Sequence, residues 1–122
     1  MHKKLLLVLT IFYTLVLAFF SLASFSSLPV IGTSYDDKIT HCIAYGILFL
    51  LWYFTLKSLK TAKPIFSAII FSLIYGIIIE VLQGQLTTDR QLDVLDVFAN
   101  LTGITIAALF IILRNRRIVK NL

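Results

Sequence analysis

The sequence predicts an all-α, polytopic membrane protein: a four-helix transmembrane bundle with its N and C termini in the cytoplasm. Of its 122 residues, 59% are hydrophobic and only 14% are charged, whereas a soluble domain carries about 25% charged residues. The apolar residues form four long runs, and acidic and basic residues gather at opposite ends of those runs. Such a chain cannot bury its apolar surface in a water-soluble core, so we expect it to lie in a lipid bilayer, which is then both its solvent and a partner.

Four apolar runs, each close to the roughly 20 residues that cross a bilayer, divide the chain. The runs 5–23 and 97–113 are uncharged, the run 39–56 is interrupted only by His41, and the run 64–84 only by Glu80. Backbone groups in lipid must satisfy their own hydrogen bonds, so each run should be a helix, and Pro64 suits the first turn of the third. The expected helices span about 5–25, 38–57, 64–84 and 93–113 of a single domain, 1–122.

The first run has a second interpretation. Lys3 and Lys4 precede it and Ser21-Leu22-Ala23 closes it, which is also the pattern of a secretory signal peptide with its cleavage site. The apolar stretch is long for such a segment, and its removal would leave little soluble mass to export. The sequence therefore favours a retained helix, with a cleaved segment as the alternative.

The basic residues indicate the orientation. Nine of the eleven lie in three segments, 3–4, 57–63 and 114–120, which a four-helix topology places on one side of the membrane. The positive-inside rule makes that side cytoplasmic. All six acids fall at or near the opposite, outer ends of the helices. No basic stripe is interleaved with aromatics, so nucleic acid is not an expected partner.

Three of the expected helices carry polar residues at spacings of three and four, which place side chains on one helix face. These stripes are Asp37, His41 and Tyr45; Gly76, Glu80 and Gln83; and Asp93, Asp96, Asn100 and Gly103. Charged groups within a bilayer are costly and normally face the bundle interior, paired with one another. The stripes therefore predict one shared, outward-facing polar pocket, with Lys38 and Arg90 at its rim.

Acid/base catalysis is the most specific function that these residues suggest for the pocket, with His41, Glu80 and Asp96 as candidate catalytic groups. The candidate binding residues are Asp37, Lys38, Tyr45, Gln83, Arg90, Asp93 and Asn100. Each has a plainer interpretation. The structural roles that stay open are His41 as a helix-end histidine bonded to a neighbouring carboxylate, Asp93 or Asp96 as a helix N-cap, and Asn100 as a partner in an interhelical hydrogen bond.

The sequence predicts no metal site. It contains no HExxH motif, no cysteine pair beside the single Cys42, and no second histidine in the expected pocket. His41, Glu80, Asp93 and Asp96 nevertheless supply nitrogen and oxygen ligands, and oxygen-rich sites suit Mg²⁺, Ca²⁺ or Mn²⁺. The sequence therefore leaves open whether a divalent metal binds, and the cofactor is unknown. Deeper in the fourth helix, Gly103 and Ala107 form a small-xxx-small pair that predicts close approach by another helix.

Together the three stripes resemble the VanZ-like family, in the order Asp37-Lys38-x-x-His41-x-x-x-Tyr45, Glu80-x-x-Gln83 and Arg90-x-x-Asp93-x-x-Asp96-x-x-x-Asn100-x-x-Gly103. The resemblance covers roughly residues 36–105. It implies a location in the bacterial cytoplasmic membrane and an association with low-level resistance to the glycopeptide teicoplanin, without a known reaction.

Three functions are compatible with these residues. The first is a non-enzymatic envelope protein that binds a lipid-linked or glycopeptide ligand on the extracytoplasmic side. The second is a membrane enzyme acting on a lipid-linked envelope substrate at the outer leaflet, and the third is a structural scaffold whose polar groups only join helices. The sequence leaves open whether the protein is an enzyme.

Overall fold

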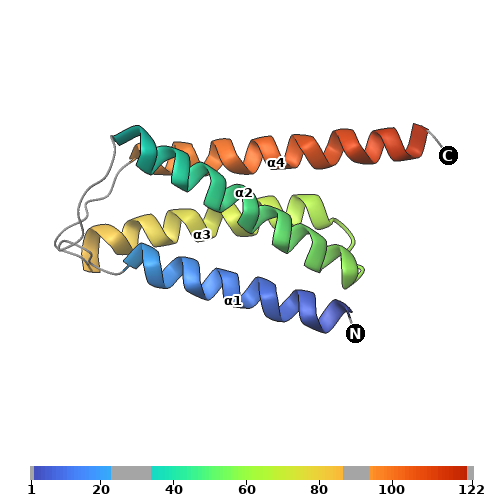
Figure 1. Ribbon diagram of the computed structural model, residues 1–122, viewed down its shortest axis with the longest axis horizontal. Coiled ribbons are helices and arrows are strands. Elements are labelled where there is room, and N and C mark those ends of the chain that lie inside the picture. Colours follow the sequence, from blue (N-terminus) through green and yellow to red (C-terminus); the bar gives the residue numbers. More distant parts are fainter. Residues whose placement is uncertain (1, 23–33, 87–93, 121–122) are drawn as a thin grey trace.

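A computed structural model describes residues 2–22, 34–86 and 94–120, all but a short interhelical segment of them helical. The four helices are α1 (His2–Leu22), α2 (Ser34–Ser58), α3 (Pro64–Leu86) and α4 (Val94–Lys120). They run alternately up and down, and both chain ends lie at the same end of the bundle as the turn between α2 and α3 (Figure 1). Each helix is long and apolar enough to cross a membrane. The protein is therefore a multi-pass, all-α membrane protein.

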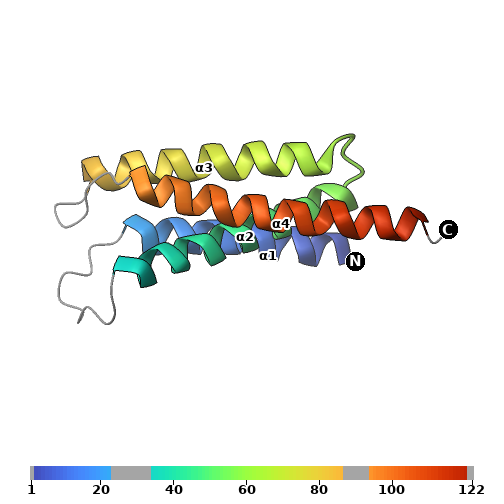
Figure 2. The same cartoon turned by 90° about the horizontal axis from the view of Figure 1, so that it is seen from above.

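The bundle is organised around α2, which contacts each of the other three helices and packs most extensively on α4. Figures 1 and 2 show all four helices running along the length of the bundle, with α2 inclined so that it crosses α4 obliquely. Large apolar side chains cover the outer faces, among them Phe12, Phe66, Phe98 and Phe110, each more than half exposed. An outer surface of this kind suits contact with lipid chains, and the core beneath it is built mostly from α2 and α4.

The helix limits agree with the sequence at some ends and differ at others. α3 begins at Pro64, as expected, but α2 begins at Ser34 and α4 continues to Lys120. Hydropathy marks only the part of a helix that lies in lipid, whereas the backbone can stay helical beyond it. Basic side chains near the end of α4 also favour its continuation, because they interact well with a helix C-terminus. The expected limits at 25 and 93 lie outside the described residues.

A tight turn ends α2 without glycine. The Lys60 amide donates to the Lys57 carbonyl and the Thr61 amide to the Leu56 carbonyl, each at 3.0 Å. This is the Schellman arrangement, which requires a left-handed residue after the helix, and Lys60 supplies it with φ of 60°. The turn leads directly to Pro64, where α3 begins.

The closest helix crossing joins α2 and α4 at Gly103. A Cβ placed on Gly103 would lie 1.9 Å from the Cys42 carbonyl oxygen, and one on Gly46 would lie 3.3 Å from the Gly103 carbonyl oxygen. Ala107, one turn further along α4, is also buried. The close approach predicted from Gly103 and Ala107 is confirmed, and it fixes α2 directly against α4 below the polar stripes.

Hydroxyl groups and aromatic side chains join α1 to the bundle. The Thr10 and Thr55 hydroxyls lie 2.7 Å apart, Trp52 Nε1 donates to Thr14 Oγ1 at 3.0 Å, and the Tyr13 hydroxyl donates to the Ala44 carbonyl at 2.6 Å. We call Thr10, Tyr13, Thr14, Ala44, Trp52 and Thr55, together with Tyr75, whose hydroxyl donates to the Thr14 carbonyl, the neutral seam. These bonds attach α1 to both α2 and α3.

Candidate functional site

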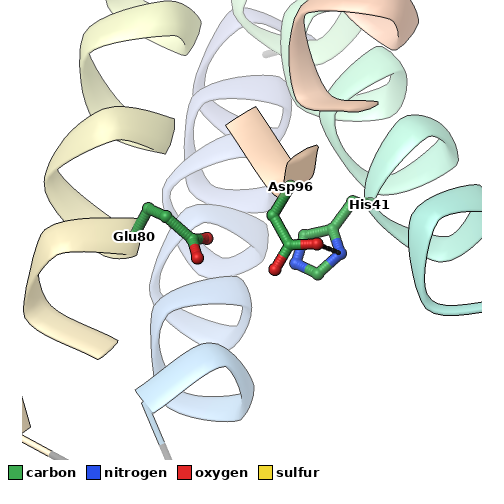
Figure 3. Close-up of side chains that lie close together, drawn as sticks. All are labelled: His41, Glu80 and Asp96. Atoms are coloured by element: carbon green, nitrogen blue, oxygen red, sulfur yellow. Dashed lines mark ion pairs between the residues drawn. The ribbon is translucent and has the colours of Figure 1, made fainter. Parts of the chain in front are cut away.

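Three helices each bring one ionisable side chain to the same place near one end of the bundle. His41 comes from α2, Glu80 from α3 and Asp96 from α4, and one ligand-type atom from each lies within 4.8 Å of the others. Figure 3 shows the three side chains pointing toward one another between the helices. Glu80 is 1% exposed and Asp96 6%, while His41 is half-buried. The convergence predicted for these residues is present in the structure.

The positions of these residues along their helices explain the meeting. Asp96 lies in the first turn of α4, where the helix dipole favours a negative charge. His41 lies two turns into α2, and Glu80 lies near the end of α3. Because neighbouring helices are antiparallel, the beginning of α2 and α4 and the end of α3 share one level of the bundle (Figure 1).

Asp96 of α4 lies next to two basic side chains of α2. Lys38, almost one turn before His41 on α2, donates from Nζ to Asp96 Oδ1. His41 Nδ1 lies 3.8 Å from the same oxygen, too far for a hydrogen bond but close enough for an ion pair when the imidazole is protonated. Two basic groups of α2 therefore face one carboxylate of α4. Lys38 retains 24% exposure of its side chain, so it lies at the boundary of the site.

A second polar layer lies one turn deeper. It consists of Tyr45, Gly76 and Asn100, each four residues from a member of the first layer on its own helix. A Cβ on Gly76 would lie 3.0 Å from Cε2 of Tyr45 and 3.1 Å from Nδ2 of Asn100. The missing side chain of Gly76 thus makes room for the other two. Asn100 is buried, and its Oδ1 has no hydrogen-bond partner among the described residues.

Gln83 connects the site to α1. It is 2% exposed, and its Nε2 donates to the Ser21 carbonyl oxygen at 2.7 Å. The last carbonyls of a helix lack partners within the helix, so Gln83 satisfies one of those at the end of α1. The sequence placed Gln83 in the shared pocket and gave no sign of Ser21, because a backbone carbonyl has no signature in the residue pattern.

The remaining predicted residues fall outside the described part of the chain. Arg90 and Asp93 lie between α3 and α4, and Asp37 belongs to α2 but its side chain is not described. An apolar groove of about 450 Å³ runs along α2 and α4 past Gly46 and Gly103.

The ionisable side chains lie close to one another, and we call His41, Glu80, Asp96 and Lys38 the ionisable layer.

Comparison with protein-family models, curated proteins and solved structures finds no match for this chain. The chemistry of the site must therefore be argued from its residues. An imidazole, two buried carboxylates and an ammonium group within one layer can transfer a proton, hold a cation or orient a polar headgroup. Apolar packing alone requires none of these groups.

Proposed function

We propose that the protein is a VanZ-like envelope protein that acts through its ionisable layer to lower sensitivity to teicoplanin-type glycopeptides. The observation that carries the proposal is the convergence of His41, Glu80 and Asp96 from three helices within 4.8 Å. The order of the sequence motifs around these residues supports the family resemblance. The proposed location is the bacterial cytoplasmic membrane, with the ionisable layer on its extracytoplasmic side.

The cost of the layer argues for a role beyond stability. Charged side chains inside a bilayer are expensive and are retained mainly where they act on ions, protons or ligands. Replacing a buried ion pair by apolar residues of similar size is often neutral or stabilising. The neutral seam shows that this bundle can join its helices with hydroxyl and aromatic groups. Helix association alone would not need Glu80 and Asp96.

The ligand that fits best is the polar part of a lipid-linked envelope molecule, approached from the outer leaflet. Lys38 is the most exposed member of the ionisable layer, so it would meet such a group first. The two carboxylates lie deeper, where they would contact hydroxyl, amide or cationic groups. Binding of this kind would change what a glycopeptide meets at the cell surface without requiring a reaction.

Conservative substitutions test the proposal. Glu80→Gln and Asp96→Asn keep size and hydrogen-bonding capacity but remove the charge. We expect both variants to lose teicoplanin protection while their abundance in the membrane stays close to that of the wild type. Thr102→Val is the matched control, because Thr102 is exposed on the same helix as Asp96 and its hydroxyl donates within α4, to the Phe98 carbonyl. Full protection by both carboxylate variants would favour the scaffold function instead.

The orientation has its own test. In a Cys42→Ala background, a single cysteine at Asp36 should react with a membrane-impermeant thiol reagent in intact cells, and one at Lys60 should not. The expectation follows from the basic residues at the end of the bundle that holds both termini. The reverse labelling would place the ionisable layer on the cytoplasmic side and contradict an action at the cell surface.

The second candidate function is that of a membrane enzyme. The half-buried His41 next to the buried carboxylate of Asp96 resembles a general base oriented by an acid. A lipid-linked envelope substrate would then be converted at the outer leaflet. His41→Gln would abolish turnover of such a substrate but leave its binding intact, whereas for a binding protein the two carboxylate variants would lose the binding itself.

A further inference from the structure

The ligand atoms of the ionisable layer form a donor set for a metal ion. His41 offers an imidazole nitrogen, and Glu80 and Asp96 each offer a carboxylate oxygen. We propose that these three residues bind a divalent transition-metal cation, Mn²⁺ or Zn²⁺, which in turn holds an anionic ligand at the outer face. This inference rests on the proposed function, because it names the ligand chemistry of the same site. It also departs from the sequence, which predicts no metal.

The spacing of the three donors suits such an ion. They lie within 4.8 Å of one another, and two ligands of a tetrahedral Zn²⁺ ion lie about 3.3 to 3.6 Å apart, since each bond is about 2.0 to 2.2 Å long. Contraction by roughly 1.2 to 1.5 Å would bring the widest pair into range. Rotation of the flexible Glu80 and Asp96 side chains supplies a movement of this size without displacing a helix.

The kind of donors selects the kind of ion. Mg²⁺ and Ca²⁺ prefer sites made of oxygen alone, whereas an imidazole favours Zn²⁺ and mixed nitrogen and carboxylate sites also accept Mn²⁺. Three protein ligands leave at least one coordination position open, as in catalytic zinc sites. That open position is where an oxygen of a phosphate or carboxylate ligand would bind.

Asn100 gives independent support from the layer below. It is 3% exposed, its Oδ1 has no hydrogen-bond partner among the described residues, and it lies one turn beneath Asp96 on the same face of α4. One helical turn is about 5.4 Å, a distance that one metal-bound water can bridge. Buried polar atoms are rarely left unpaired, and second-sphere acceptors of this kind commonly orient metal sites.

Lys38 acts as the competitor of the cation. Its ammonium group donates to Asp96 Oδ1, one of the two carboxylates that the metal would need. With the imidazole neutral, the four side chains of the ionisable layer sum to −1 (two carboxylates and one ammonium), and a divalent cation changes the sum to +1. Cation binding would thus reverse the charge of the layer and allow it to attract an anionic headgroup.

Direct binding measurements on the purified full chain in detergent test the proposal. After treatment with a chelator, Mn²⁺ is titrated and free Mn²⁺ is measured by electron paramagnetic resonance, with Zn²⁺ as competitor. We expect saturable binding of one ion per chain. Glu80→Gln and Asp96→Asn should each weaken binding by about tenfold or more. Lys38→Gln should tighten it severalfold, and Lys57→Gln, which removes a lysine at the other end of α2, should leave it unchanged.

Two results would overturn the cation site: no saturable binding up to millimolar Mn²⁺ or Zn²⁺, or unchanged binding in the carboxylate variants. If Asp96→Asn is not recovered as folded, monodisperse protein, His41→Gln takes its place. This variant should weaken metal binding to the same extent, and the half-buried position of His41 makes the substitution easier for the fold to accept. Teicoplanin protection separates the two proposals. Loss of protection in Glu80→Gln without metal binding by the wild type would refute the cation and keep the proposed function. Metal binding through the three residues, together with intact protection in both carboxylate variants, would keep the cation site and refute the proposed function.

Discussion

Two polar regions of this bundle differ in kind. The neutral seam joins α1 to α2 and α3 with hydroxyl groups, an indole and backbone carbonyls. The ionisable layer joins α2, α3 and α4 with an imidazole, two carboxylates and an ammonium group. The first consists of groups that stay neutral at physiological pH, while the second consists of groups that exchange protons or bind cations.

The difference separates what holds the bundle together from what it is proposed to do. Hydroxyl and amide groups can bond across helices without carrying a charge into the membrane, and each such bond is worth about 0.6 kcal/mol on average. Carboxylates stabilise the bundle no better than these neutral groups unless they are paired, and a buried carboxylate that has lost its partner destabilises the fold. Substitutions in the seam should therefore act on stability alone, whereas substitutions in the layer should act on function and, at the Lys38–Asp96 pair, on stability as well.

The largest loss of stability is expected from Gly103→Ala, at the crossing of α2 and α4 beneath the ionisable layer. The new Cβ would lie 1.9 Å from the Cys42 carbonyl oxygen, a backbone atom that cannot move aside alone. We expect a loss of about 3 kcal/mol in stability, the upper part of the range for overpacked interiors. Thermal unfolding in detergent measures it. Gly46→Ala, whose Cβ would meet the Gly103 carbonyl oxygen at 3.3 Å, should cost clearly less.

The next largest expected effect is the coupling energy between Lys38 and Asp96, which tests the ionisable layer itself. A hydrogen bond to a charged group is worth about 1.5 to 3 kcal/mol, and Asp96→Asn leaves the Lys38 ammonium without that carboxylate. The double variant Lys38→Gln/Asp96→Asn should recover part of the stability lost by Asp96→Asn. Unfolding of the four proteins in a double-mutant cycle gives the coupling energy. Strict additivity would mean that the pair contributes nothing to the fold.

A smaller loss is expected in the neutral seam. Thr10→Val removes the hydroxyl that lies 2.7 Å from Thr55 Oγ1 and should lower stability by about 0.6 kcal/mol, the average for an interhelical bond in a membrane. Teicoplanin protection should remain intact. Loss of protection at normal abundance would contradict the division between seam and layer.

The smallest effect is a gain. Lys60 occupies a left-handed conformation with φ of 60°, which costs a residue with a Cβ roughly 1 to 2 kcal/mol. Lys60→Gly relieves that strain at the expense of unfolded-state entropy, for a net stabilisation of about 0.5 kcal/mol. A raised unfolding temperature would confirm it. In this background the variants of the ionisable layer can be compared at higher abundance, which separates lost function from lost protein.

The sequence alone was sufficient for the helices and for the faces that carry the site. Apolar runs predicted four helices, and the spacing of His41, Glu80 and Asp96 predicted that they would meet. Both predictions depend on local chemistry: the need of a backbone in lipid to bond to itself, and the helical period that fixes which residues share a face. The small residues at Gly103 and Ala107 likewise predicted the close crossing.

The tertiary structure alone decided how those faces combine. It paired Lys38 with Asp96, bonded Gln83 to the end of α1, and filled the space beside Gly76 with Tyr45 and Asn100. The helical period fixes a face, but it leaves open how far each helix rotates and shifts against its neighbours. Those two variables depend on side chains from several helices at once, so no single stretch of the sequence contains them.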